Sequence, residues 1–167
     1  VDGSLIYRTG LEYDVQNRLT ALKENVANRQ YRTTYAYDND NRVTGMTFDG
    51  ENALSYTYDN LGRIATRATG PLSSTYGYVD GGYGAGSTTP LVSSIQQTGI
   101  SFSYTYDNRG NITSETRNGA TTTYAYDALG QLVRVNDPHE NATWVYNYDR
   151  GGNITRTIQY TYTTGEP

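Results

Sequence analysis

The 167 residues carry a formal net charge of −4 and include 18 Tyr and 18 Gly but no Cys. The missing cysteines exclude a disulfide framework and a thiolate metal site. The mild, evenly spread acidity argues against a nucleic-acid-binding protein, and no apolar run approaches the ~18 residues of a membrane-spanning helix. Only 35% of the residues are hydrophobic, Tyr included, so we expect a core that is aromatic and partly polar.

One motif recurs along almost the whole chain: Tyr-Asp, two variable residues, Gly or Asn, one variable residue and an aliphatic residue. This spacing is typical of a type I turn, in which the Asp side chain bonds back to the backbone and the fourth residue tolerates positive φ. An aliphatic residue then opens the return strand. We therefore predict structural turn roles for Asp14, Asp38, Asp59, Asp107, Asp127 and Asp149, and positive φ at Gly62, Gly110, Gly130 and Gly152.

A Tyr-x-Tyr pair precedes most of these turns. Residues two apart in a strand point to the same face, so the pattern predicts one aromatic face and one face of small polar residues such as Thr57 and Thr105. Seven pairs follow this pattern, the last at 160 and 162. The predicted structural aromatic ladder comprises Tyr37, Tyr58, Tyr106, Tyr126, Tyr148 and Trp144.

The remaining turns belong to a second class. Asp49-Gly50 and Asn118-Gly119 predict two-residue type I′ turns, whereas residues 25–28 and 136–141 predict longer loops. A Gly-rich insertion at 79–90 stands where a normal turn belongs, and loops of this length are usually functional or mobile. Tyr83 lies in this insertion, outside the ladder, and is a candidate ligand-binding residue.

Together these elements predict an all-β fold: an antiparallel meander of repeated β-hairpins, about fourteen short strands forming a curved sheet or strip. Residues 1–167 are expected to form a single domain. The sequence begins in strand-like residues and ends without a closing element, so we interpret it as an excerpt from a longer protein. Its two terminal strands lack protecting Pro residues. We therefore expect the segment either to curl tightly on its own aromatic face or to self-associate through edge strands or that face.

The repeated unit, clearest in Tyr-Asp-Asn-Arg-Gly-Asn-Ile-Thr at 106–113, resembles the YD repeat of the Rhs family. That family includes bacterial Rhs and wall-associated proteins, toxin-complex shell proteins and teneurins. The resemblance covers Glu12 to Tyr162. It implies a β-sheet strip that spirals into a hollow shell, and a scaffold that can encapsulate a toxin or display other domains. The implied location is extracellular or bacterial cell-wall associated.

The resemblance also implies the partners: neighbouring YD repeats of the same polypeptide, with an enclosed toxin segment or surface glycans as further partners. One departure concerns the Asp-Pro-x-Gly-Leu type of motif that often ends such bacterial shells. Here Asp137-Pro138 is followed by His139-Glu140, so the family's aspartate-dependent self-cleavage is not implied.

Catalytic and metal-binding interpretations are weaker than structural ones. Paired carboxylates could do acid–base work, but turn capping explains all six motif Asp residues. His139 is the only His and has no nucleophile to activate, and no calcium-binding pattern surrounds the other carboxylates. We predict no catalytic residues, no metal and no cofactor, and hence a scaffold. The alternative is a carbohydrate- or protein-binding surface that uses exposed Tyr residues.

The basic residues are twelve Arg and one Lys. Two interpretations stay open: guanidinium groups that stack on Tyr rings, or codon bias.

Overall fold

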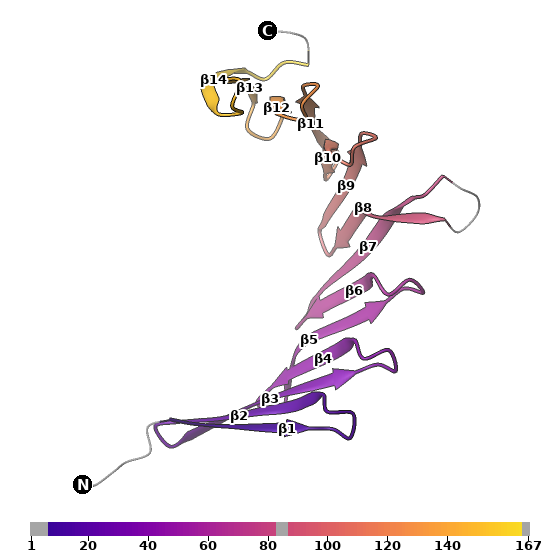
Figure 1. The fold of residues 1–167 in the computed structure, drawn as a ribbon, viewed down its shortest axis with the longest axis vertical. Helices are drawn as coiled ribbons and strands as arrows, with labels where there is room; N and C mark the ends of the chain where they lie inside the picture. Colours follow the sequence, from indigo (N-terminus) through magenta and orange to yellow (C-terminus); the bar gives the residue numbers. More distant parts are fainter. Residues whose placement is uncertain (1–6, 83–86, 165–167) are drawn as a thin grey trace. The chain divides into compact units, whose positions relative to one another are not determined.

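The computed structural model describes residues 7–82 and 87–164. The described residues form fourteen strands and no helix, and each strand lies beside its sequence neighbours, in the order β1 to β14 (Figure 1). The prediction of an all-β antiparallel meander of hairpins is confirmed. The chain divides into two compact units, residues 1–75 and 76–167.

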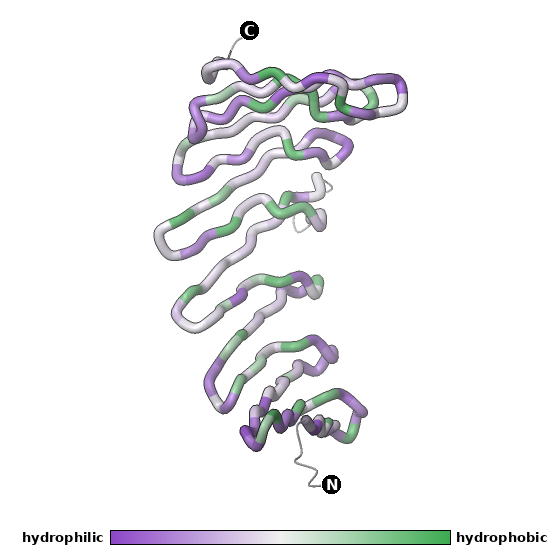
Figure 2. The backbone as a smooth tube through the Cα atoms, turned by 90° about the vertical axis from the view of Figure 1, so that its left-hand side faces the viewer, coloured by the Kyte–Doolittle hydropathy of each residue, from purple (hydrophilic) through white to green (hydrophobic). Residues whose placement is uncertain are grey.

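The first unit contains β1 (Tyr7–Tyr13), β2 (Leu19–Val26), β3 (Arg29–Tyr37), β4 (Val43–Phe48), β5 (Glu51–Tyr58) and β6 (Ile64–Thr69). Strand β7 (Leu72–Asp80) crosses the boundary between the units. The second unit continues with β8 (Thr88–Gln97), β9 (Ile100–Tyr106), β10 (Ile112–Arg117), β11 (Ala120–Tyr126), β12 (Leu132–Asp137), β13 (Ala142–Tyr148) and β14 (Ile154–Thr161). In both units hydrophilic residues gather at the turns, with apolar residues beside them (Figure 2).

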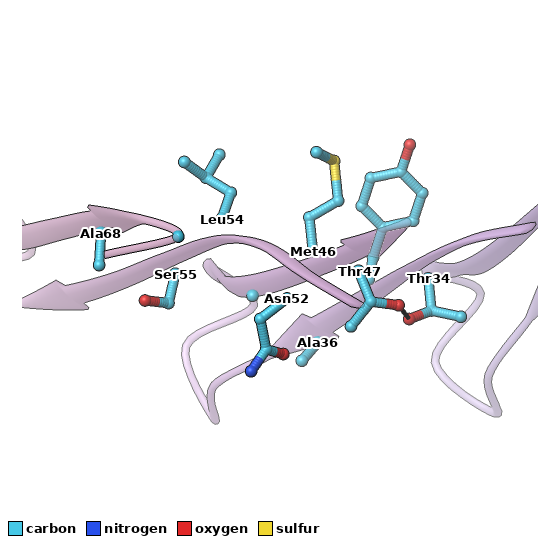
Figure 3. A pocket seen from close by; sticks show the side chains of 11 residues that line it. Thr34, Ala36, Met46, Thr47, Asn52, Leu54, Ser55 and Ala68 are labelled. Atoms are coloured by element: carbon cyan, nitrogen blue, oxygen red, sulfur yellow. Dashed lines mark hydrogen bonds between the residues drawn. The ribbon is translucent and has the colours of Figure 1, made fainter. Parts of the chain in front are cut away.

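Alternate residues of the strands point to opposite faces, as the period of two predicts. On β5, Tyr56 and Tyr58 are partly buried and Thr57 between them is exposed. The same alternation recurs on β9, β11 and β13. Figure 3 shows Met46 and Leu54 on one side of the sheet and Ala36, Asn52 and Ser55 on the other. We call these sides the Tyr face and the hydroxyl face.

The described residues bury very few side chains completely. Ala21 and Ala142 are the buried hydrophobic residues, and Thr143 is the largest side chain that is fully buried. The Tyr rings are only partly covered, because a single sheet layer has no second layer above them. Cross-strand pairs and backbone hydrogen bonds therefore carry the stability of each unit.

Each hairpin that is closed by a Tyr-Asp turn contains a β-bulge. Tyr37 pairs with Val43 while Ala36 pairs with Gly45, so Thr44 is an extra residue on the return strand. The register shifts in the same way beside Tyr13, Tyr58, Tyr106, Tyr126 and Tyr148. A bulge increases the local twist and disrupts the hydrogen-bond ladder at one residue.

The Tyr-Asp turns are type I turns followed by a residue in the left-handed region. In the turn after β9, the N–H of Gly110 donates to the carbonyl of Asp107 at 3.1 Å, and the N–H of Asp107 donates to the carbonyl of Asn111 at 2.9 Å. Gly110 has a φ of 85°. Gly62, Gly130 and Gly152 have φ of 79°, 82° and 83°, and Asn17 and Asn41 have 62° and 65°.

Two predicted loops are shorter than the sequence suggests. The loop predicted at 25–28 is wrong: Val26 pairs directly with Arg29, and Ala27 and Asn28 form a two-residue turn with φ of 47° and 66°. Strand β12 likewise continues to Asp137, which leaves only residues 138–141 between β12 and β13.

The Gly-rich insertion predicted at 79–90 also needs correction. Strand β7 runs to Asp80 and β8 begins at Thr88, so only residues 81–87 lie between them. The hydroxyls of Thr88 and Thr89 both donate to the carbonyl of Val79, at 3.0 and 3.1 Å. These β-branched residues extend the pairing into the predicted loop. Tyr83 lies outside the described residues.

The last Tyr-x-Tyr pair does not belong to the Tyr face. Tyr160 lies on β14, directly opposite Thr143, whereas Trp144, Tyr146 and Tyr148 of β13 face the other way. Strand β14 is a return strand, and the other six pairs lie on strands that precede a turn. The register with β13, rather than the motif, decides which face Tyr160 occupies.

We predict that Gly110→Ala lowers the free energy of unfolding by about 1–2 kcal/mol, the cost of placing a Cβ in the left-handed region. Sterics play no part, because the nearest atom to the added Cβ is Leu91 Cδ2 at 4.0 Å. Gly110→Asn is the matched control and should lose much less, because Asn tolerates this conformation and occupies it at Asn17 and Asn41. Urea unfolding measures both, and equal losses would contradict a backbone origin.

Candidate functional site

The motif carboxylates are used by the turns that they begin. Asp59 Oδ1 accepts hydrogen bonds from the N–H groups of Leu61 and Arg63, both at 2.9 Å, and Oδ2 accepts from Arg63 Nε at 2.7 Å. The two N–H bonds recur at 2.8–2.9 Å on Asp14, Asp38, Asp107, Asp127 and Asp149. Carboxylates held in this way cap turns and are not arranged for acid–base chemistry.

These hydrogen bonds favour the ionised carboxylates. The N–H of Arg18 is the main cause that lowers the pKa of Asp14. The side-chain amides of Asn111 and Asn153 are the main causes that lower the pKa of Asp107 and Asp149. Desolvation opposes ionisation of Asp38 and Asp59, but their hydrogen bonds outweigh it, so the pKa of each is lowered as well.

In five of the Tyr-x-Tyr pairs the second Tyr donates its hydroxyl to the preceding hairpin. Tyr106 donates its hydroxyl to the carbonyl of Val92 at 2.7 Å, and Tyr126 donates to the carbonyl of Ile112 at 2.9 Å. The same bond links Tyr37 to Leu19, Tyr58 to Val43 and Tyr148 to Leu132, at 2.7–2.8 Å. Partial burial raises the pKa of Tyr106 and Tyr126, so these hydroxyls stay protonated and able to donate.

The sequence-based analysis missed this bond, since it treated Tyr only as an aromatic ring. In four of the five bonds the accepting residue opens a return strand next to its bulge, where the ladder is disrupted, and the exception is Val92 inside β8. The motif is defined by its Tyr, so the six Tyr residues are no independent signal of this bond. The hydroxyl bonds give a physical reason for Tyr rather than Phe, since a ring alone would satisfy packing.

We call the Tyr hydroxyl bond between successive hairpins the joint between repeats. In the first unit, Arg side chains add further contacts at this joint. Arg18 Nε pairs with Asp14 Oδ2 at 2.7 Å, and Arg18 Nη1 donates to Asn41 Oδ1 of the next turn at 2.8 Å. Its guanidinium lies 4.8 Å from the centre of the Tyr37 ring, and that of Arg42 lies 4.7 Å from the Tyr58 ring. These contacts favour Arg–Tyr stacking as the interpretation of the abundant Arg. In the second unit, Asn111, Gln131 and Asn153 take the same position.

The other predicted or considered residues do not gather into a site. Trp144 is partly buried on β13, and His139 is exposed, with its N–H bonded to Asp137 Oδ1 at 2.8 Å. Within residues 7–82 and 87–164, no three His, Asp or Glu side chains are grouped so that they could hold a metal ion. The described part of the chain contains no helix long and apolar enough to cross a membrane.

The tips of the turns project into solvent. Val15 is fully exposed, and Leu61 and Leu129 are largely exposed. A shallow hollow of about 320 Å³ lies between β3 and β6, where Ala36, Gly45, Ser55 and Ala68 form its wall with other residues (Figure 3). No carboxylate, imidazole or amine lines this hollow.

Comparison with known proteins relates the chain to shell proteins. The teneurin YD-shell family matches residues 1–81 and 82–166. Comparison with curated protein sequences gives no match. The chain is similar to the TcdB2-TccC3-Cdc42 crystal structure, with 21% identity and a TM-score of 0.74 over 93% of this chain and 9% of that chain.

Two further solved structures are similar at the same 21% identity. The Photorhabdus luminescens Tc holotoxin pore has a TM-score of 0.72 over 92% of this chain and 9% of that chain. TcdB2-TccC3 without its hypervariable C-terminal region has a TM-score of 0.72, with coverage of 93% and 9%. At this identity the likeness shows the fold, and this chain spans 9% of the length of each of those chains.

We predict that Tyr106→Phe lowers the free energy of unfolding by about 0.5–1.5 kcal/mol, because it removes one net hydrogen bond to the carbonyl of Val92. Tyr104→Phe is the matched control on the same strand and face, because no hydrogen-bond partner of its hydroxyl is seen within the described residues. That variant should be nearly neutral. Urea unfolding of both proteins compares them, and equal effects would mean that the hydroxyl bond adds no stability.

We also predict a loss of stability in acid. Because the folded protein lowers the pKa of Asp14, Asp107 and Asp149, their stabilisation is fully present above the unfolded pKa of about 3.9. It is lost as pH falls through the lower folded values. The urea concentration at the unfolding midpoint should therefore decrease as the pH drops below about 4. This decrease should be smaller in Asp107→Asn. A midpoint independent of pH in this range would contradict the cap geometry.

Proposed function

This chain is a member of the teneurin YD-shell family, and we propose that it builds part of the wall of a β-sheet shell within a longer polypeptide. The observation that carries the proposal is the joint between repeats. In five repeats, a Tyr hydroxyl donates to a carbonyl of the preceding return strand, at 2.7–2.9 Å. In four of them that carbonyl belongs to the first residue of the strand, and the exception is Val92, which lies inside β8. A structure made of identical joints between neighbours extends in one direction by adding hairpins.

The chemistry of the motif supports a scaffold without a catalytic step. Asp and Tyr are the motif's reactive side chains, and the turns and the joints already use them. Strands β1 and β14 each have one neighbour in the sheet, so each offers a free edge to adjacent repeats. We therefore propose that the partners of this chain are the neighbouring YD repeats of its own polypeptide.

The proposal extends to cargo and location. The structural neighbours include a Tc holotoxin pore, which supports an enclosed toxin segment as a further partner. It also supports a secreted or bacterial cell-surface parent protein. Membership of the family and the similarity in fold support the proposed cargo and location, and no pocket enters this argument.

A glycan-binding surface is the second candidate function. The observation that favours it is the exposure of Tyr7 and Tyr13, at 58% and 53%, on the edge strand β1. Such rings could stack on sugars. The ladder tyrosines do not support it, because they are partly buried and their motif hydroxyls are already bonded. Saturable glycan binding that is lost in Tyr7→Ala and Tyr13→Ala would favour this function over the scaffold.

The absence of Cys allows a direct test of the wall. Thr57 and Arg67 are both exposed on adjacent strands. Thr57 lies on the hydroxyl face, and Arg67 lies opposite Tyr56 on the Tyr face. We would introduce Thr57→Cys and Arg67→Cys separately into a cysteine-free longer polypeptide and measure labelling by a bulky maleimide.

A closed wall shields one face, so we expect one cysteine to react far more slowly than the other in the longer polypeptide. Both should react at similar rates in the isolated segment. Val15→Cys, at a turn tip, is the control and should react quickly in both proteins. Equal, rapid labelling of the two faces in the longer polypeptide would contradict the wall.

A further inference from the structure

Arg134 is a buried charged side chain in the second unit, and the joint between repeats does not use it. Only 9% of its surface is exposed. It lies on β12, opposite Ala125 on one side and Val145 on the other, which places it on the hydroxyl face. Arginine is almost never buried without partners, because burial of its charge is unfavourable unless hydrogen bonds compensate. Its partners therefore indicate what this part of the face binds.

A network of side chains aims the guanidinium. Arg134 Nε donates to Asn136 Oδ1 at 2.8 Å, and Asn136 Nδ2 donates to Thr123 Oγ1 at 3.0 Å. Arg134 Nη2 donates to the main-chain carbonyl of Thr163 at 3.4 Å. The residues that hold Arg134 come from β11 and β12, whereas Thr163 lies beyond the end of β14.

Thr143 binds the same residue. Its side chain is fully buried, and its Oγ1 accepts a hydrogen bond from the N–H of Thr163 at 3.0 Å. The same Oγ1 lies 3.1 Å from the carbonyl oxygen of Thr163. Arg134 and Thr143 together thus contact both main-chain polar groups of one residue. We call these two side chains the main-chain clamp.

We propose that the main-chain clamp is a binding site for an extended polypeptide segment, and that Thr163 occupies it in this chain. The clamp contacts an N–H and a carbonyl, which every residue except Pro provides. The ligand class is therefore an extended peptide without Pro at the clamped position. This site goes beyond the wall role, because it holds a segment that lies on the sheet and is not one of its strands.

Because the clamp is occupied by the chain's own segment, an added peptide must compete with that segment for the site. Thr163 follows the last residue paired with the β13 hairpin, since the N–H of Tyr162 still donates to the carbonyl of Asn141. Another extended segment can therefore replace Thr163 in the clamp without breaking a pair of strands. A ligand that binds only the vacated form has its apparent affinity reduced by the fraction of vacated molecules. Weakening the internal segment should therefore strengthen binding of an added peptide.

The test uses the full chain with Thr163→Pro, which removes the N–H that Thr143 accepts. The probe is a blocked synthetic peptide with the sequence of residues 160–166, followed by NMR. We expect saturable shifts at the Arg134 Nε–H and the Thr143 amide, with a lower dissociation constant than in the unmodified chain. A peptide with proline at the position of Thr163 is the negative probe and should not bind.

Matched variants identify the clamp. Adding Thr143→Val removes the hydroxyl at constant shape and should abolish peptide binding, whereas Thr143→Ser should retain it. Thr105→Val, elsewhere on the hydroxyl face, should leave binding unchanged. No saturable shift in the Thr163→Pro chain would overturn the proposal, as would undiminished binding after Thr143→Val.

Amide hydrogen exchange in the otherwise unmodified chain gives a second measurement that needs no added peptide. Thr143→Val should accelerate exchange at Thr163 and leave Tyr162 unchanged, because the N–H of Tyr162 donates to Asn141 at 3.0 Å. Thr143→Ser should preserve protection at Thr163. Unchanged protection in Thr143→Val would show that the clamp does not hold this segment.

Discussion

The fold depends on a hydrogen bond to one main-chain carbonyl in each joined repeat, at the start of the return strand in four of the five. The bulge beside each Tyr-Asp turn gives the return strand an extra residue, so the carbonyl that opens this strand lies where the ladder is disrupted. A partly buried carbonyl without a partner costs stability. The hydroxyl of the next motif Tyr binds it. One side chain thus satisfies this carbonyl and joins two successive hairpins.

The two units differ in the side chain that binds the carboxylate of the motif Asp. In the first unit Arg18, Arg42 and Arg63 pair with the motif Asp four residues earlier. In the second unit Asn111 and Asn153 donate uncharged amide bonds to the same position. Ion pairs at a surface weaken as salt increases, and amide bonds depend on salt much less. The same backbone turn is therefore stabilised by a salt-dependent contact in one unit and a largely salt-independent one in the other.

The sequence predicts those features that local chemistry decides. Asp and Gly at fixed spacing decide the turns, and the period of two decides which residues share a face. Features that depend on register were not predicted: the bulges, the Tyr hydroxyl bonds, and the contact between Arg134 and Thr163, which are 29 residues apart. Composition misled at residues 79–90, where glycine suggested a long loop but Thr88 and Thr89 continue the strand. Ala27 was missed because nothing in its side chain favours positive φ. Tyr160 was misplaced because a motif carries no information about the register with the neighbouring strand.

The projecting turn tips have a consequence for how such a chain changes over time. The motif Asp, the Gly or Asn and the Tyr fix the backbone, whereas Val15, Leu61 and Leu129 extend into solvent from that fixed frame. The side chains of these three residues take no part in the joints, so we expect substitutions there to leave the joints intact. These hairpins thus offer positions where new side chains can be introduced at little cost to folding. A row of repeats presents such positions at regular intervals, so a protein of this kind can acquire new surface properties while its wall stays the same.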